Sequence, residues 1–197
     1  MLDLEIIALT PDKLDDYLYF FENVAHTDNR QWDRCYCVDY CSDKNLYVGD
    51  FDAISADERR EYAVRYVKEG ILQGYMAYAD GKMAGWCNAN DRASCRNCTG
   101  WRQIFGSTRC EDETAKIKSI FCFTVAPAMR SKGIAEALLK KVIEDAVRSG
   151  YDFVEGYPNK SETDMYYNYV GPEALYRKLG FEKYGETENR YVYRKKL

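Results

Sequence analysis

One short basic stretch constrains this 197-residue chain more than any other feature. The stretch Arg130-Ser131-Lys132-Gly133-Ile134-Ala135 separates a segment with the two-residue period of a strand from a segment with the period of an amphipathic helix. The first N–H groups of a helix have no partner inside it, and the helix dipole places partial positive charge at that end. A strand, a tight glycine turn and a helix start therefore predict an anion-binding site, to which Arg130 and Lys132 add charge.

The two flanks of this turn support the prediction. Residues 117–125 alternate so that one face is strongly apolar, which favours a strand, and Pro127 then ends the ladder. After Gly133, apolar residues recur at helical spacing as far as position 147, and Gly150 is suited to cap that helix in the left-handed conformation. The pattern is typical of a helix packed on a sheet.

Length and charge limit the class of protein. A chain of 197 residues fits one domain, with or without an insertion. The net charge of −4 argues against a nucleic-acid surface, which normally carries a clustered basic excess. No leader-like segment stands at positions 1–5, and the most apolar run, 120–129, is about half the length of a membrane crossing. We therefore expect a cytoplasmic protein without nucleic-acid or membrane partners.

The remaining elements can be predicted from local signals. A capping box of Ser55 and Glu58 starts a helix that reaches Gly70, and Asp80-Gly81 is a strong hairpin signal. Further strands are expected at 4–9, 74–79, 82–88, 153–157, 181–184 and 190–194, and further helices from Thr10-Pro11 and at 173–179. The polar segment 89–113 is too long for an ordinary loop and predicts a lid or an inserted flap.

The single histidine and the cysteines could have catalytic, metal-binding or purely structural roles. His26, the only histidine, falls where the first helix should end, and it has no neighbouring cysteine or acid that would make it a base. Cys95 and Cys98, together with Cys35 and Cys37, would supply four sulfurs for a structural zinc ion, although one pair has the wrong spacing for a common zinc knuckle. A reactive Cys37 is a second alternative. Reduced, free thiols and no metal are the expectation.

Two motifs resemble a known family. The strand end at 125–127 followed by 130–135 resembles the Arg/Gln-x-x-Gly-x-Gly/Ala signature of the GNAT superfamily, the acyl-coenzyme A dependent N-acyltransferases. Residues 175–181, Leu-Tyr-Arg-Lys-Leu-Gly-Phe, look like the Tyr-x-x-x-Gly-Phe of that superfamily's late helix. Together the motifs span about a third of the chain.

The resemblance implies roles for particular residues. The pyrophosphate of coenzyme A would rest on the turn, and its pantetheine arm would pair with the backbone of a splayed central strand. Tyr176 would protonate the leaving thiolate, with a plain core tyrosine as the alternative. Asn168 lies one residue from the spacing of a pantetheine-binding asparagine, which Tyr169 holds here. The implied cofactor-binding residues are Phe123, Thr124, Val125, Arg130, Ser131, Lys132, Gly133, Ile134, Ala135 and Asn168.

The resulting prediction is an α/β (α+β) fold, in which a mixed, mostly antiparallel sheet carries helices on both faces. Residues 1–197 would form a single GNAT-like acetyltransferase domain with a flap insertion at 89–113. It would move acetyl from acetyl-CoA directly to a primary amine of a small molecule or peptide, since no cysteine or serine nucleophile has a base partner. A homodimer is left open.

Two parts of the mechanism stay open at this point. The acceptor pocket would be lined by 31–52, the flap, and the tyrosines at 166, 167 and 169. Glu111, Asp112, Glu113 and Glu155 are candidate bases, each with a solvated charge as its alternative role. The alternative functions are a catalytically silent acyl-CoA-binding sensor and a zinc-stabilised interaction domain.

Overall fold

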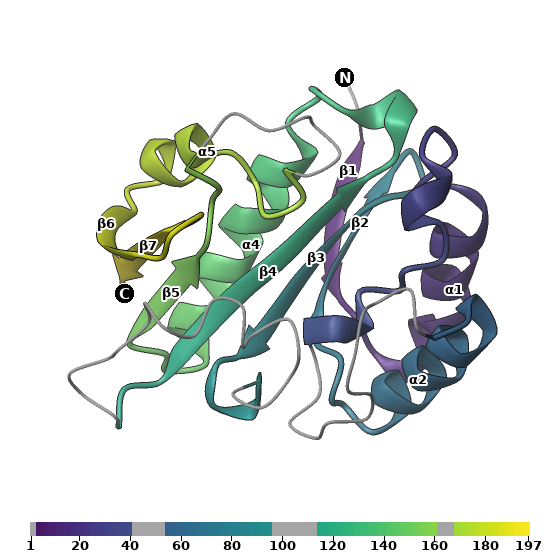
Figure 1. The fold of residues 1–197 in the computed structure, drawn as a ribbon, viewed down its shortest axis with the longest axis horizontal. Coiled ribbons are helices and arrows are strands. Elements are labelled where there is room, and N and C mark those ends of the chain that lie inside the picture. Colours follow the sequence, from purple (N-terminus) through teal and green to yellow (C-terminus); the bar gives the residue numbers. More distant parts are fainter. Residues whose placement is uncertain (1–2, 41–53, 96–113, 161–167) are drawn as a thin grey trace.

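The fold is a single seven-stranded sheet between two layers of helices (Figure 1). The computed structural model describes residues 3–40, 54–95, 114–160 and 168–197. The strand order is β1-β2-β3-β4-β5-β7-β6. Every neighbouring pair is antiparallel except β4 and β5, which run parallel. The predicted mixed, mostly antiparallel sheet is confirmed.

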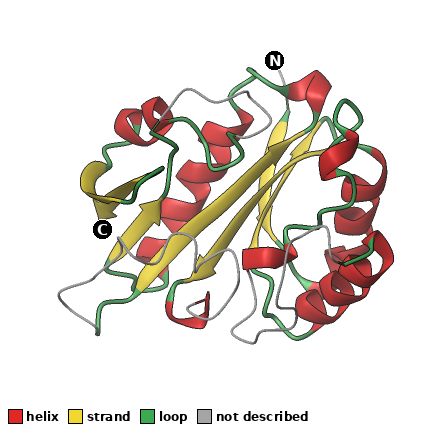
Figure 2. Cartoon of the chain, viewed as in Figure 1, coloured by secondary structure: helices red, strands yellow, loops and turns green. Residues whose placement is uncertain are grey.

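The elements follow the order expected from the sequence (Figure 2). The strands are β1 (Leu4–Ala8), β2 (Gly74–Ala79), β3 (Lys82–Asp91), β4 (Ile117–Val125), β5 (Phe153–Gly156), β6 (Glu182–Glu186) and β7 (Tyr191–Lys196). The α-helices are α1 (Leu14–Asn23), α2 (Ala56–Lys68), α4 (Ile134–Arg148) and α5 (Glu173–Lys178). Short 3-10 turns are η1 (Pro11–Lys13), η2 (Arg30–Trp32), η3 (Val38–Tyr40), η5 (Ala93–Cys95) and η7 (Pro127–Met129).

Helices cover both faces of the sheet, as predicted. The apolar sides of α1 and α2 pack with Met76 and Trp86 on one face of β2 and β3. On the other face, α4 packs over Ala77 and Cys87, and α5 adds Tyr176 beside Val154 of β5. In Figure 1, α1 and α2 lie on one side of the sheet and α4 on the other. None of the helices in the described ranges is long and apolar enough to cross a membrane.

Local sequence signals fix several element ends. The Ser55 hydroxyl accepts from the amide of Glu58 at 3.2 Å, and the Glu58 carboxylate accepts from the amide of Ser55 at 2.9 Å, so the capping box is complete. Asp80 and Gly81 both have positive φ, 49° and 76°, as a type I′ hairpin turn requires. Gly150 follows α4 with φ of 68°, which confirms the predicted left-handed cap.

The predicted helix start at Thr10-Pro11 is confirmed, since Thr10 is the N-cap and Pro11 the first helical residue, although the first turn is a 3-10 turn and the α-helix starts at Leu14. The predicted flap does not begin at residue 89, because β3 continues to Asp91 and pairs Ala89 with Ile120 of β4. The polar composition of this stretch hid a strand whose polar side chains are buried. Residues 96–113 lie outside the described ranges.

A bulge in β4 sets the geometry of the middle of the sheet. Asn88 of β3 pairs with Cys122, but the next residue, Ala89, pairs with Ile120, so Phe121 is an extra residue on β4. A bulge of this kind bends its strand and turns two consecutive side chains to one face. Phe121 and Cys122 accordingly both join the apolar layer of α1 and α2.

Candidate active site

The predicted anion-binding turn forms a series of outward-facing backbone amides at the start of α4. Ser131 and Gly133 both have positive φ, 61° and 83°, on either side of Lys132. The first backbone bond of the helix runs from the amide of Ala137 to the Gly133 carbonyl, 3.0 Å away. Within the described ranges, no backbone acceptor faces the amides of residues 131–135. Successive amides in alternating conformations form a concave anion site, and the helix dipole adds to it.

Packing holds this turn close to the sheet. Ile134 is buried, and its side chain lies directly over Gly85 of β3. A Cβ at Gly85 would come within 2.8 Å of Cγ2 of Ile134, so only glycine permits this approach. Ser131, Lys132 and Gly133 themselves are exposed. The anchored Ile134 therefore leaves the amides before it accessible.

Arg130 forms an ion pair with a residue that is distant in sequence. Two N–H groups of its guanidinium donate to the two carboxylate oxygens of Asp28, in the loop after α1. This bidentate pair ties that loop to the turn. Lys132 is exposed and reaches only the sulfur of Met129, at 3.6 Å, so it is the more available of the two predicted cations.

A second ion-pair group joins α4 to α5. Glu136, in the first turn of α4, accepts from Lys140 and from Lys178 of α5. The hydrogen bonds from Lys140 and then Lys178 lower the pKa of Glu136 to about 2. The carboxylate next to the anion site is thus balanced by two lysines.

Beyond the bulge, β4 and β5 separate. Their pairing runs from Ile117–Phe153 to Ile120–Gly156 and stops there, although β4 continues to Val125. Backbone groups of a strand point alternately to its two sides. The amide of Ala126 donates to Ala84, toward β3, and the amide of Phe123 points toward the β5 side. Phe123 and Val125 therefore face the fork between the strands.

Thr124 differs from the prediction for this reason. Its backbone groups belong to the ladder with Trp86 of β3, and its buried hydroxyl lies 3.5 Å from Sγ of Cys122. The sequence-based assignment of Thr124 as a backbone contact of the pantetheine arm was therefore wrong about the direction of its polar groups. The backbone N–H and C=O groups of successive residues in a strand point to opposite edges, so only every second residue can pair with a ligand at one edge.

The fork is partly filled by the segment before α5. The amide of Phe123 donates to the carbonyl of Tyr169 at 2.6 Å. The carbonyl of Asn168 accepts from the amide of Gly171 in a tight turn, with φ of 82° at Gly171. The segment 168–171 therefore lies along the edge of β4. The structure records no side-chain contact for Asn168.

Tyr176 lies at the point where the strands part. Its ring faces Gly156, the last residue of β5, where a Cβ would come within 2.6 Å of the phenolic oxygen. The ring is fully buried, and its hydroxyl donates to the carbonyl of Val170 at 2.6 Å. Burial raises the pKa of Tyr176 well above its ordinary value. The position suits the predicted proton donor, and the burial suits the alternative role as a core residue.

Aromatic rings surround the bulge on the face of α1 and α2. The ring of Phe121 stacks on Tyr40, with centroids 5.2 Å apart, and on Tyr157, with centroids 5.8 Å apart. The hydroxyl of Tyr40 lies 3.1 Å from that of Tyr169. Arg190 donates to the same Tyr169 hydroxyl at 3.0 Å. This group, called the bulge cluster below, consists of Tyr40, Phe121, Tyr157, Tyr169 and Arg190.

The sequence pointed to only part of the bulge cluster. Tyr40 lies in the predicted aromatic segment and Tyr169 was named, whereas Phe121 and Arg190 were missed. A continuous apolar run at 120–123 was the only local sign of a bulge. Tyr166, Tyr167, Glu111, Asp112 and Glu113 lie outside the described ranges.

Glu155 is a buried, paired carboxylate. It accepts from Arg92 at 3.0 Å and from Arg194 of β7 at 2.6 Å. Tyr157 also donates to it at 3.0 Å and lies 2.7 Å from the hydroxyl of Ser119. Its carboxylate oxygens are thus occupied by two guanidinium groups and a hydroxyl. This arrangement favours a structural role for Glu155 over the candidate role as a base.

The described cysteines are buried or half-buried thiols. Asn88 donates to Sγ of Cys37 at 3.4 Å, and a hydrogen bond with Cys37 lowers the pKa of Cys122. Sγ of Cys35 lies 3.4 Å from Nε2 of His26. In the ranges given above, no three metal-binding side chains gather around one point. Cys98, which the zinc hypothesis needs, is not among the described residues.

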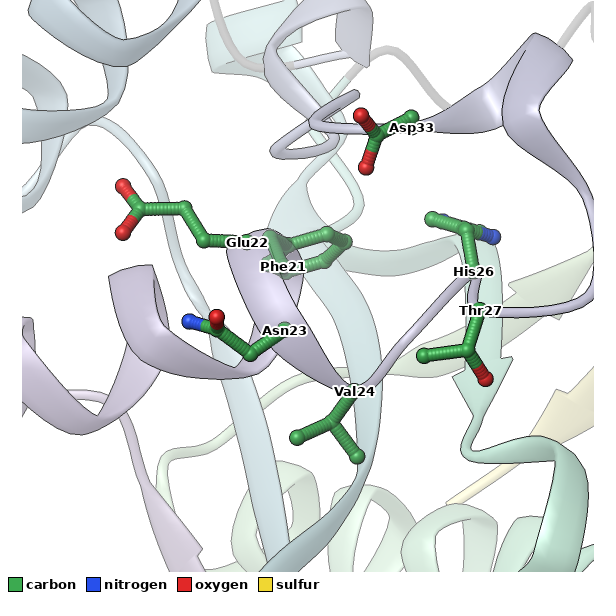
Figure 3. Close-up of a pocket in the computed structure, with 7 residues that line it drawn as sticks. All are labelled: Phe21, Glu22, Asn23, Val24, His26, Thr27 and Asp33. Atoms are coloured by element: carbon green, nitrogen blue, oxygen red, sulfur yellow. The ribbon is translucent and has the colours of Figure 1, made fainter.

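His26 lines a small pocket at the end of α1 (Figure 3). The pocket has a volume of about 160 Å³ and is lined by Phe21, Glu22, Asn23, Val24, His26, Thr27 and Asp33. Burial, and then the charge of Arg130, lower the pKa of His26 to about 4. A neutral histidine bonded to a thiol fits the predicted structural role at the helix end.

Comparison with known proteins identifies the architecture. Residues 72–183 match the family model described as the acetyltransferase (GNAT) domain. This range contains the turn at 130–135, the fork of β4 and Tyr176. A search of curated proteins gives no match.

Solved structures of similar fold are numerous. An N-acetyltransferase from Staphylococcus aureus Mu50 is 15% identical, with 98% of each chain covered and a TM-score of 0.54. Ribosomal-protein-alanine N-acetyltransferase from Brucella melitensis is 16% identical, with 98% of this chain and 99% of that chain covered and a TM-score of 0.55. PaiA N-acetyltransferase from Thermoplasma acidophilum, solved with coenzyme A, is 15% identical, with 99% of each chain covered and a TM-score of 0.56.

At such identities the solved structures establish only a common fold, whereas the family model covers more than half of the 197 residues and both motifs. On that match, with the sheet order and the fork beside it, the chain belongs to the GNAT acetyltransferases.

Proposed function

We propose that this acetyltransferase moves the acetyl group of acetyl-CoA directly to a primary amine of a small molecule or peptide. The observation that carries the proposal is that the amides at the start of α4 follow in sequence a β4 edge with which β5 no longer pairs. The amides at 131–135 lie at the end of the β4 edge that carries Phe123 and Val125. One extended ligand with a diphosphate at one end and amide groups along its length would fit both surfaces.

The donor would be held mainly by backbone. The amides of Ser131 to Ala135 would bind the diphosphate, with Lys132 adding charge and Arg130 fixing the turn through Asp28. Val125 and Phe123 would pair with the pantetheine arm, once the carbonyl of Tyr169 has released the Phe123 amide. Bound acetyl-CoA supplies a thioester whose carbonyl carbon is open to attack by an amine.

Tyr176 is proposed to donate a proton to the departing thiolate. Its ring lies at Gly156, where the fork begins. The hydroxyl already acts as a donor, to Val170 at 2.6 Å, so a short movement would redirect the same proton. A phenol kept protonated by burial is a suitable general acid at neutral pH.

The acceptor is proposed to approach from the face of the bulge cluster. Both Phe121 and Cys122 turn to this face beside the end of the β4–β5 pairing. Direct transfer is preferred because Cys122, the thiol on β4, has Thr124 and Cys37 as partners rather than a base. Deprotonation of the amine by water is preferred to Glu155, which two arginines hold.

The test is release of free coenzyme A thiol from acetyl-CoA in the presence of amines. Amino acids, polyamines, aminoglycosides and peptide N-termini form the first panel. Acetylated product and amine-dependent thiol release are expected. Binding of acetyl-CoA by calorimetry without release for any amine would favour the alternative, a catalytically silent sensor. We further propose that residues 1–197 form one domain, with an insertion between β3 and β4.

A further inference from the structure

Arg190 is a half-buried cation without a carboxylate partner among the described residues. It precedes β7 and is half-buried, and its Nη2 group donates to the hydroxyl of Tyr169 at 3.0 Å. Its Nη1 group is inaccessible to solvent and has no hydrogen-bond partner. Among the residues that the structure describes, no acidic side chain forms an ion pair with it. Nη1 is therefore a donor left for the acceptor atom of a ligand.

Three other arginines in the described ranges have carboxylate or carbonyl partners. Arg92 and Arg194 share the carboxylate of Glu155. Arg59 donates to the carbonyls of Ile54 and Arg34, at 2.6 and 3.0 Å. Burying a charge without a counter-charge is costly, so such groups are usually paired. Within the described ranges, Nη2 of Arg194 lacks a hydrogen bond but still forms an ion pair with Glu155. Arg190 instead has a tyrosine hydroxyl as its acceptor and an Nη1 group without one in the described part of the chain, which points to a ligand rather than to stability.

The guanidinium lies close to the proposed site of transfer. Tyr169 connects the two, because its carbonyl accepts from Phe123 of β4 while its hydroxyl accepts from Arg190. The hydroxyl of Tyr40 lies 3.1 Å from that of Tyr169, and the ring of Tyr40 stacks on Phe121, the bulge residue. The cation is thus separated from the β4 edge by the length of one tyrosine side chain.

We propose that Arg190 binds a carboxylate of the acceptor, so that the substrate is an amine that also carries a carboxylate, as amino acids do. This inference rests on the proposed acetyl transfer. The planar guanidinium group can form two parallel hydrogen bonds with a planar carboxylate. The aromatic rings of Tyr40 and Tyr169 beside it suit an acceptor with an apolar portion and a single negative charge.

The experiment compares matched acceptors in the thiol-release assay. The pairs are L-phenylalanine with L-phenylalaninamide, β-alanine with β-alaninamide, and phosphoethanolamine with ethanolamine. For the wild-type protein, kcat/KM should favour the carboxylate over its amide by about 10- to 100-fold, the usual worth of a charge-assisted hydrogen bond. Arg190→Gln should reduce this ratio to about 1, chiefly through KM, and Arg190→Lys should keep part of it. Arg148→Gln, at the far end of α4, should keep the wild-type ratio.

The thermal stability of Arg190→Gln provides a second test of the inference. A guanidinium held for a ligand should not be needed by the fold, so the Tm of Arg190→Gln should lie within about 2 °C of wild type or above it. A clear drop in Tm with an unchanged acid-to-amide ratio would make Arg190 a structural residue and overturn the inference.

The failures can be told apart. Thiol release with equal rates for acids and amides would overturn the inference and leave the proposed transfer standing. A preference for phosphoethanolamine over both carboxylates would replace the carboxylate with a phosphate. No release with any amine, together with no binding of acetyl-CoA, would remove the proposed function and the inference with it.

Discussion

The amide of Phe123 and the carbonyl of Tyr169 meet at 2.6 Å across the opening between β4 and β5. The segment that carries Tyr169 thus pairs with the same strand edge that an extended donor would use. An added strand needs both the N–H and the C=O groups of that edge. The donor and Tyr169 therefore compete for Phe123, whereas Val125 is open to the donor alone.

Amide hydrogen exchange can follow this competition. We expect the amide of Phe123 to be protected both without and with coenzyme A, because one acceptor replaces another. The amide of Val125, which has no backbone acceptor among the described residues, should become protected only when coenzyme A is added. Exchange at Val125 that does not respond to saturating coenzyme A would argue against pairing along this edge.

Gly133→Val should abolish coenzyme A binding. A β-branched residue at φ of 83° costs about 1–2 kcal/mol of stability and changes the direction of the amides around it. The space at Gly133 is open, so the stability loss should come from backbone strain alone. Calorimetry with coenzyme A measures the affinity, and urea unfolding measures the stability.

The control for Gly133→Val lies at the other end of the same helix. Gly150 also has positive φ, 68°, and open space around it. Gly150→Val should lose a similar amount of stability and retain wild-type affinity for coenzyme A. Equal loss of affinity in both variants would mean that helix stability, rather than the anion site, sets binding.

Tyr176→Phe should lower kcat while leaving coenzyme A affinity unchanged, if the hydroxyl protonates the thiolate. Its stability should fall by about 1 kcal/mol, since the buried Val170 carbonyl loses its donor. Tyr193→Phe is the matched control, because Tyr193 is packed in the same layer and donates to Glu173. It should lose stability without losing kcat. Wild-type kcat in Tyr176→Phe would leave only the core role.

Glu155→Gln should behave as a structural variant. Removing the charge takes away the carboxylate that Arg92 and Arg194 share, which costs about 3–5 kcal/mol. Glu186→Gln, which breaks an exposed pair with Lys183, should leave the free energy of unfolding nearly unchanged. Urea unfolding separates the two. A Glu155→Gln protein with wild-type stability and a lost acidic limb in its pH–rate profile would instead identify Glu155 as the base.

The buried His26 predicts a loss of stability in mild acid. Its pKa falls from 6.5 in the unfolded chain to about 4 in the fold, so the folded protein binds fewer protons between these values. Stability is therefore complete above pH 6.5 and declines as the pH falls toward 4, by about 1.4 kcal/mol per pH unit. The difference in unfolding free energy between wild type and His26→Gln at pH 7 and pH 5 isolates this contribution. No change in that difference would show that His26 is not buried as a neutral ring.

Short-range signals in the sequence were sufficient for most of the framework. The capping box at Ser55, the turn at Asp80-Gly81 and the left-handed cap at Gly150 each follow from residues close to one another in sequence, and all three were predicted. The glycine turn before α4 was also predicted from contiguous residues, whereas its role as an anion site stays a prediction.

The features that the sequence did not predict depend on pairing between segments that are distant in sequence. The extra residue at Phe121 exists only relative to β3, whose register no local pattern reveals. Arg190 resembles any arginine next to a strand until Tyr169 is placed beside it. The strand at 89–91 was missed because Asn90 and Asp91 are polar, although Asn90 is buried and bonded to Asn88 and Gln73.

The extra residue at Phe121 marks the point at which β4 changes its neighbours. Up to Ile120 the strand pairs on both sides, with β3 and with β5, whereas beyond Phe121 its ladder is with β3. Deletion of that single codon would make the register with β3 continuous and would remove the ring that stacks on Tyr40 and Tyr157. The consequence of one inserted residue is therefore an aromatic face placed where the second partner strand ends.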